Sequence, residues 1–413
     1  MRSAGTANRP TPDGGGRDDL GSQPSIRRRH RLCALVGFVA VAAPFEARAE
    51  ATAPAGVEAA FEYTLDVVAP VAGARRDAYV LDNLDVSLRF DMARLTGWQD
   101  TTIFVHALNN SGDAPNDEIA TLQGVDNIEV ARQSARLYEL WIERGFGPLS
   151  LRAGLYDLNS EFYSNESAAL LIAPAFGIGS ELAATGANGP SIFPSTALAV
   201  RAAFELSAQS QIKLAVLNAA AGVLGDPGGV DTSFDAGALI IGEWSWLGST
   251  HINLGAWAYS DRQDDIRDLN LAGDPQRRRA YGAYITLERL LIGEAGAPRA
   301  LSGFLRVGAS EGDTTPFDGG WQAGLVVQEV WDNRPASVIS IGVNQGYLSA
   351  KYQANERDLG ALSADAESAL EVTYADTIGH LTIQPDIQFI HQPGGARDRD
   401  DVVVTTLRFS AAF

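Results

Sequence analysis

Alternating charged and aromatic residues on neighbouring segments could form a polar binding wall. Within residues 136–143, Glu139, Trp141 and Glu143 stand two positions apart, and Arg152 follows in the next apolar run. Residues two apart in a β-strand face the same side. Carboxylates accept hydrogen bonds from hydroxyl groups, guanidinium groups donate them, and aromatic rings stack on apolar C–H faces. This set could therefore form a wall that exchanges hydrogen bonds with a polar solute and contacts its apolar side.

Four further residues are candidates for the same wall. Arg89, Arg201 and Trp257 share parity with the polar side of their own predicted strands, and Glu161 lies in a long connection. Each Arg or Glu could instead be a solvated wall residue or half of a cross-strand ion pair. Trp141 could also face outward, because both parities of its segment carry apolar groups. A one-residue error in register would turn each strand residue to the opposite face.

The sequence offers little for catalysis, and we expect no enzyme and no cofactor. Histidines 106, 251, 380 and 391 are scattered over different predicted strands and ends. No nucleophile elbow, zinc-ligand spacing or phosphate-binding loop is present. Acidic loop residues could hold divalent cations at a lipopolysaccharide surface, although a solvated acidic face is the simpler interpretation: Asp113, Asp117, Glu118, Asp264 and Asp265.

The N-terminal segment, residues 1–49, has the pattern of a leader with a signal peptide. A basic run at 27–31 precedes an apolar stretch of about a dozen residues, and Ala47-Arg48-Ala49 forms a small-x-small cleavage site. We therefore expect export and a mature chain of residues 50–413. The one cysteine, Cys33, lies in the removed part, so the mature chain has no disulfide framework.

The charge and hydropathy of the mature chain exclude two classes of protein. Removing eight arginines and four acids with the leader leaves 24 basic and 47 acidic residues, a net charge of −23. Such acidity argues against nucleic-acid binding. No later segment approaches eighteen consecutive apolar residues, which excludes a helical membrane protein. A secreted soluble β-protein, such as a lectin, and an outer-membrane barrel remain.

Period-two alternation predicts sixteen short strands. They lie at about residues 57–67, 83–92, 102–108, 136–143, 149–155, 197–205, 211–218, 238–246, 251–259, 280–289, 301–309, 322–329, 338–345, 367–375, 381–390 and 402–413. The connections alternate between long and short, so in a meander all the long ones lie at one end. Long extracellular loops and short periplasmic turns are typical of outer-membrane barrels. We therefore predict a 16-stranded antiparallel transmembrane up-and-down β-barrel in the outer membrane.

The faces of these strands support the barrel. Most charged residues of the strands share parity with polar neighbours, whereas Tyr63, Trp244, Trp246 and Tyr281 have outward parity and suit aromatic girdles. Pro385 lacks an N–H for the ladder and predicts a bulge or a locally broken rung. The last strand ends in Phe413, which resembles the signal that the outer-membrane assembly machinery recognises.

The longest connection, residues 157–195, is too long for an ordinary turn and has to be accommodated within the fold. A structureless loop of this length would count against a compact soluble domain. Inside a wide barrel it can fold into the lumen, so we predict that it narrows the pore. Sixteen to eighteen strands leave an aqueous channel, whose selectivity depends on the groups that line it.

Residues 134–205 resemble the carbohydrate-selective porins of the OprB type, and the similarity continues more loosely to Phe413. The resemblance rests on these stretches: Tyr138-Glu139-Leu140-Trp141, residues 152–162, Phe176-Gly177-Ile178-Gly179 and residues 188–194. It implies a sixteen-stranded barrel that passes sugars such as monosaccharides by facilitated diffusion. It also implies a constriction of arginine, glutamate and aromatic residues. A general non-selective porin and a barrel-type hydrolase are the alternatives, and the barrel could be a monomer or a homotrimer.

Overall fold

Sixteen antiparallel strands close into a barrel in the computed structural model, which describes residues 56–186, 188–222 and 228–413. Each strand pairs with its neighbours in the chain, and β1 closes the sheet against β18. This confirms the predicted 16-strand barrel, while the predicted leader, residues 1–49, lies outside the described residues. The strands are β1 Val57–Ala72, β2 Tyr79–Asp91, β3 Thr101–Gly112, β4 Ala135–Phe146, β5 Leu149–Tyr156, β6 Ala197–Ser207, β7 Ser210–Asn218, β8 Ala238–Leu247, β9 Thr250–Tyr259, β12 Tyr281–Ile292, β13 Leu301–Ser310, β14 Phe317–Gln328, β15 Val338–Leu348, β16 Ala366–Ile378, β17 Leu381–His391 and β18 Val402–Ala412.

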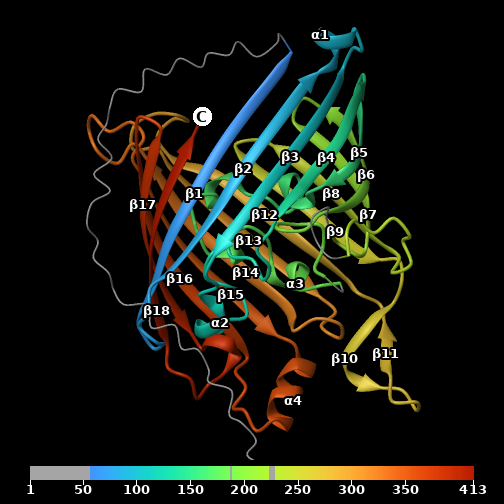
Figure 1. Cartoon of the computed structure of the whole chain (residues 1–413), viewed down its shortest axis with the longest axis vertical. Coiled ribbons are helices and arrows are strands. Elements are labelled where there is room, and N and C mark those ends of the chain that lie inside the picture. The colour runs from blue at the N-terminus through green and yellow to red at the C-terminus, as the bar shows by residue number, and fades with distance from the viewer. Residues whose placement is uncertain (1–55, 187, 223–227) are drawn as a thin grey trace, which may run out of the picture. The chain divides into compact units, whose positions relative to one another are not determined.

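The two ends of the barrel differ in the length of their connections. Short turns and the C-terminus lie at the upper end in Figure 1, and the long connections lie at the lower end. We call these the short-turn end and the long-loop end. The connections also contain elements that the sequence did not predict, namely α1 Met92–Thr96, α2 Asn116–Ile119, α4 Ala350–Asp358 and the hairpin of β10 Gln263–Leu269 and β11 Pro275–Arg278.

The outer wall is apolar and the inner wall carries the charges. Val200 and Leu214 are 57% and 50% exposed on the outside, whereas Arg201 and Arg306 are 2% and 0% exposed on the inside. The side chains of Tyr63, Trp246 and Tyr281 are exposed on the outer face, and Trp244, which shares the outward parity of Trp246, is half-buried. In the described residues, no helix is both long enough and apolar enough to span a membrane.

Pro385 produces the locally broken rung and no bulge. On one side, the β16–β17 pairs Thr373–Asp386 and Asp376–Ile383 keep one register, and the two positions between them, 374 with 385 and 375 with 384, are unpaired. On the other side, Pro385 pairs with Leu407 of β18 without interruption. The missing N–H therefore accompanies a local gap of two pairs and leaves the strand order intact.

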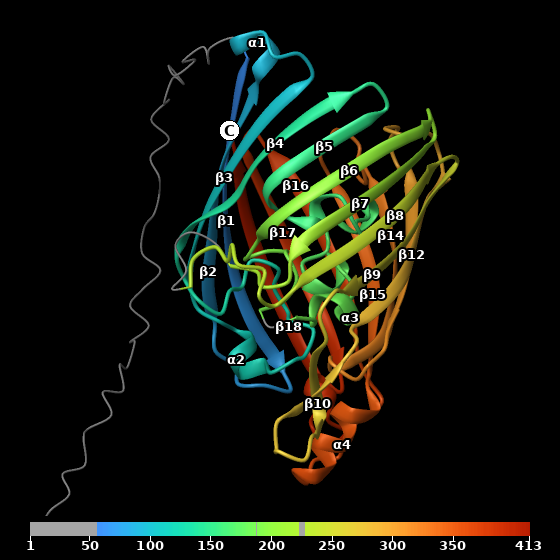
Figure 2. The same cartoon turned by 90° about the vertical axis from the view of Figure 1, so that its right-hand side faces the viewer.

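Two long connections fold into the barrel, whereas the sequence predicted one. Residues 157–196 carry α3 Ser180–Ala183 inside the wall, as Figure 2 shows, and bury Phe162, Tyr163 and Leu182 against it. We call this segment the constriction loop. Residues 113–134 also turn inward and pack Ile119, Val125 and Ile128 on β1, β2, β17 and β18.

The inner wall is not polar throughout, because part of it supports these loops. Leu217, Leu239 and Ile241 face inward on β7 and β8 and are buried beneath the constriction loop. Glycines on the wall let the loop approach closely. A Cβ on Gly308 would lie 1.8 Å from Glu181 Oε1, and one on Gly342 would lie 2.5 Å from a methyl group of Leu171. The loop is therefore packed against the wall and does not hang free in the lumen.

An ion cluster joins three connections at the long-loop end. The Lys351 ammonium of α4 lies 3.0 Å from carboxylate oxygens of Asp268 and Asp313 and also contacts buried Asp265. Arg278 of β11 adds a second contact to Asp265 at 3.1 Å. Burial alone would raise the pKa of the Asp265 carboxyl, but hydrogen bonds from Lys351, backbone N–H groups and Arg278 lower that pKa to about 2.

We predict that acid loosens this cluster. Because the pKa of Asp265 is depressed in the folded state, its contribution is complete above about pH 4 and is lost as the pH falls towards 2. Spin labels at the exposed positions Leu271 and Leu359 should show a broader distance distribution over this range. Lys351→Met should give the broad distribution already at neutral pH. An unchanged distribution down to pH 2 would contradict the prediction.

Candidate functional site

Carboxylates of the barrel wall hold the constriction loop by its backbone. Glu243 accepts from Tyr163 N at 3.0 Å and from the Tyr284 hydroxyl at 2.7 Å. Glu288 accepts from the backbone N–H groups of Glu166 and Ser167, both at 3.1 Å. Glu371 does the same for residues 172 and 173. An irregular loop inside a barrel has N–H groups without ladder partners, and these glutamates supply the acceptors.

Arg306 performs the complementary task for carbonyl groups. Its guanidinium is fully buried and donates to the carbonyl oxygens of Tyr163 at 3.1 Å, Gly177 at 2.8 Å and Ala175 at 3.1 Å, and also to that of Phe176. One wall side chain thus satisfies four loop carbonyls.

Four charged residues predicted to line the pore form one closed network. Arg201 of β6 lies 2.8 Å from Glu143 and 2.8 Å from Glu161. Arg152 of β5 lies 2.6 Å from Glu143 and 3.2 Å from Glu161. The Tyr156 hydroxyl also donates to Glu161 at 2.6 Å. Two guanidinium groups and two carboxylates neutralise one another, so this network fixes the start of the constriction loop to the wall.

Aromatic rings and arginines stack beside this network. The Trp141 ring lies between the Arg152 guanidinium, 3.8 Å from its centroid, and the Phe104 ring, whose centroid is 5.0 Å away. Arg89 stands over Phe104 at 5.4 Å and over Trp141 at 5.9 Å. Trp141 faces the interior but is only 5% exposed, so both of its faces are covered.

Arg89 differs from the other predicted arginines. It is exposed inside the barrel, and among the described residues no carboxylate forms an ion pair with it. Its guanidinium therefore keeps donors that can serve a solute. The guanidinium groups of Arg152 and Arg201, by contrast, form ion pairs with Glu143 and Glu161.

Glu139 and Trp257 complete the placement of the predicted residues. Glu139 accepts from Trp141 Nε1 and Asp157 N, both at 3.2 Å, and lies 3.7 Å from His106. Trp257 faces inward on β9 but lies apart from Trp141, buried beneath the constriction loop against Tyr259. Seven of the eight predicted residues therefore share one region, and Trp257 does not belong to it.

Sequence reasoning missed Phe104, His106 and Tyr138. A register shift puts Tyr138 as an extra residue between the pairs His106–Glu139 and Ala107–Leu137. The bulge turns both Tyr138 and Glu139 to the interior, where their side chains are 4% and 6% exposed. Phe104 was readable in principle, because it shares parity with His106 on its strand, whereas the bulge has no signal in the residues.

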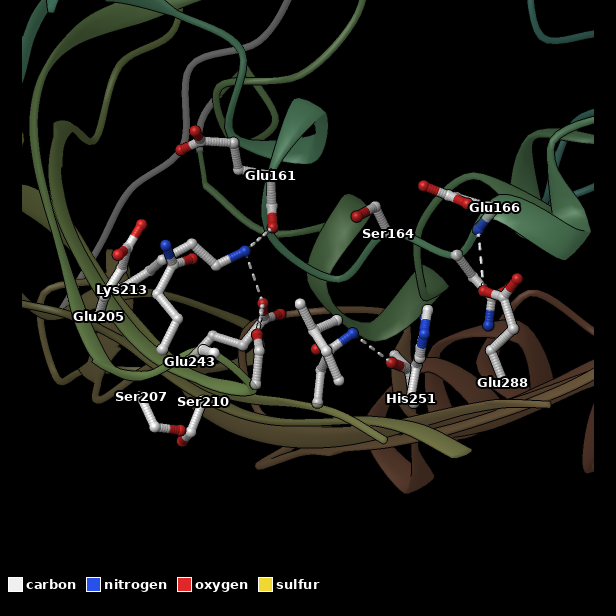
Figure 3. A pocket seen from close by; sticks show the side chains of 17 residues that line it. Glu161, Ser164, Glu166, Glu205, Ser207, Ser210, Lys213, Glu243, His251 and Glu288 are labelled. Carbon is white, nitrogen blue, oxygen red and sulfur yellow. Dashed lines mark hydrogen bonds and ion pairs between the residues drawn. The ribbon is translucent and has the colours of Figure 1, made fainter. Parts of the chain in front are cut away.

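A polar cavity of about 350 Å³ lies beyond the network, between residues 161–166 and strands β6–β9 and β12 (Figure 3). We call it the short-turn cavity, because Ser207 and Leu247 of its lining lie beside short turns. Lys213 lines this cavity. Its ammonium group donates to the backbone carbonyl of Glu161 and lies 2.8 Å from the Glu243 carboxylate. Glu205, Gln211 and His251 also line it.

Two of the acidic loop residues, Asp264 and Asp265, form ion pairs with basic residues of the same chain. Asp265 joins the Lys351 cluster, and Asp264 lies 2.6 Å from Arg277. Among the described residues, no group of three or more His, Cys, Asp or Glu side chains is placed to hold a metal ion.

A closed sixteen-strand wall with an inward loop and a charged, aromatic interior is the architecture of a porin. The family model for the carbohydrate-selective porin, OprB family, matches residues 75–413. The chain belongs to this family. It is an outer-membrane sugar channel, and the long-loop end is accordingly extracellular and the short-turn end periplasmic.

Several known proteins are similar to this chain over most of its length. Porin B of Pseudomonas aeruginosa is 21% identical over 402 residues, which cover 87% of this chain and 88% of that protein. The high-pH structure of Pseudomonas putida OprB matches with a TM-score of 0.78 at 21% identity, over 87% of this chain and 94% of that chain. The outer membrane channel DcaP of Acinetobacter baumannii matches at 0.53 and 10% identity, over 87% and 99%. These structural similarities show the fold.

We predict that Arg306→Met releases the constriction loop. Four loop carbonyls, three of them buried, would lose their donor, and each buried group left unsatisfied costs about 1–3 kcal/mol. Because the β12–β13–β14 ladder does not depend on this side chain, the barrel should still form, while single-channel conductance rises and becomes noisier. Arg289→Met, on the exposed outer face of β12, is the matched control and should leave conductance unchanged. Equal conductance in both variants would contradict the role of Arg306.

Proposed function

We propose that this porin passes small neutral sugars by passive diffusion and that the selective contact is centred on Arg89 and Phe104. The observation that carries this proposal is the exposed guanidinium of Arg89 over the half-buried Phe104 ring. Guanidinium donors can replace the hydration of sugar hydroxyls, and a ring edge or face can contact the C–H side. Such contacts must remain weak enough for the sugar to leave.

The neutralised network supports a neutral solute over an anion. Arg152 and Arg201 hold their charges against Glu143 and Glu161, so they add no net positive potential. The chain from residue 50 onward is strongly acidic, with only Lys213 and Lys351 as lysines. A channel with this charge balance repels anions and has no strong site for them.

Liposome swelling tests the sugar preference. Wild-type porin should admit glucose faster than amino acids of the same size. Equal rates for glucose and for these amino acids would show that the protein is a general porin, which the fold alone does not exclude.

Removing the free guanidinium tests the proposed contact. Arg89→Gln should slow glucose entry about threefold, equivalent to roughly 0.6 kcal/mol, near the lower end of the net value of a hydrogen bond. Arg144→Gln is the matched control, because Arg144 is exposed on the outer face of β4 and its loss should leave the rate unchanged. An unchanged rate of glucose entry in Arg89→Gln would show that Arg89 does not form the selective contact.

A further inference from the structure

We propose that the short-turn cavity is a second, periplasmic sugar subsite, which favours neutral and amino sugars and disfavours sugar acids. This inference rests on the proposed function, because it deepens the description of the same channel. It concerns a separate set of residues from Arg89 and Phe104.

The position of the cavity puts it next to the route past the constriction loop. Glu161 belongs both to the neutralised network and to the cavity lining, so the two regions adjoin. Ser207 and Leu247 extend the lining to the periplasmic turns. A solute that has passed the network therefore meets this cavity before it leaves the barrel.

The lining is suited to hydroxyl groups. Ser164, Gln211 and His251 offer donors and acceptors, and no Phe, Tyr or Trp is found among the described residues that line the cavity (Figure 3). The Asn165 amide nitrogen is buried and lacks a hydrogen-bond partner among the described residues. A volume of about 350 Å³ is at the lower end of small-ligand sites. The occupant is thus a small polyhydroxylated molecule held by its polar groups, without ring stacking.

The charge of the lining selects among such molecules. Glu161, Glu243 and Glu288 are engaged with Arg201, Lys213 and loop N–H groups, respectively. The carboxylates of Glu166 and Glu205 have neither an ion-pair nor a hydrogen-bond partner in the described part of the chain. The uncompensated charge of the cavity is therefore negative. At a separation of about 4 Å in water, one such charge changes the occupancy of a charged solute about fivefold.

Uptake into proteoliposomes tests this assignment with glucosamine and gluconate at about pH 6, where the amino sugar is protonated. The double variant Glu166→Gln/Glu205→Gln removes both free charges and preserves side-chain shape. The matched control is Glu294→Gln/Glu329→Gln, which removes two charges from periplasmic turns outside the cavity. A difference in migration between unheated and boiled samples in SDS gels establishes that every variant is folded.

The expected result is a glucosamine-to-gluconate uptake ratio that falls at least fivefold in the cavity variant and stays at the wild-type value in the control. High salt should reduce the wild-type ratio towards that of the cavity variant, because exposed charges are screened. An unchanged ratio in the cavity variant, or an equal fall in the control, would overturn the subsite. Failure of the proposed function is seen separately, as a loss of the preference for glucose over amino acids in the wild type.

Discussion

The structure depends on satisfying the backbone of irregular loops inside a closed barrel. Strands of the wall use their N–H and C=O groups on one another, so an inward loop finds no ladder to join. Inward glutamates of β8, β12 and β16 provide acceptors, and Arg306 of β13 provides donors. Buried polar groups without partners are expensive. The wall charges are therefore first of all the partners of the loop, and the position of the loop follows from them.

This requirement changes the meaning of charge in the lumen. An arginine with inward parity looks like a lining residue, yet Arg201 is occupied in holding Glu161 of the constriction loop. Strong pairing of this kind is compatible with a channel for neutral solutes, because it leaves no deep electrostatic well in which an ion would be trapped. The residues left free, such as Arg89 and Glu205, then determine the weak preferences on the two sides of the network.

Much of the fold could be predicted from the residues alone. Alternation of period two gave the strands, and the rhythm of loop lengths gave the meander and its polarity, because both arise from geometry that each segment carries by itself. The β10–β11 hairpin and the inward path of residues 113–134 could not be predicted, since they depend on contacts between distant connections. The bulge at Tyr138 was equally invisible, because one extra residue in a strand leaves the composition unchanged. For the site, parity placed the side chains, but their partners are often backbone groups, which have no sequence signature.

One signal in the sequence does point to the path of the constriction loop. Gly308 and Gly342 sit at inward parity on β13 and β15, where strand propensity disfavours glycine. A glycine in a strand marks a place where another part of the protein approaches closely, and here the carboxylate of Glu181 and the side chain of Leu171 occupy the space of the missing Cβ. Two of the three glutamates that accept loop N–H groups lie on adjacent strands, Glu288 on β12 beside β13 and Glu371 on β16 beside β15. Inward glycines combined with inward glutamates on adjacent strands therefore indicate a wall that supports a loop.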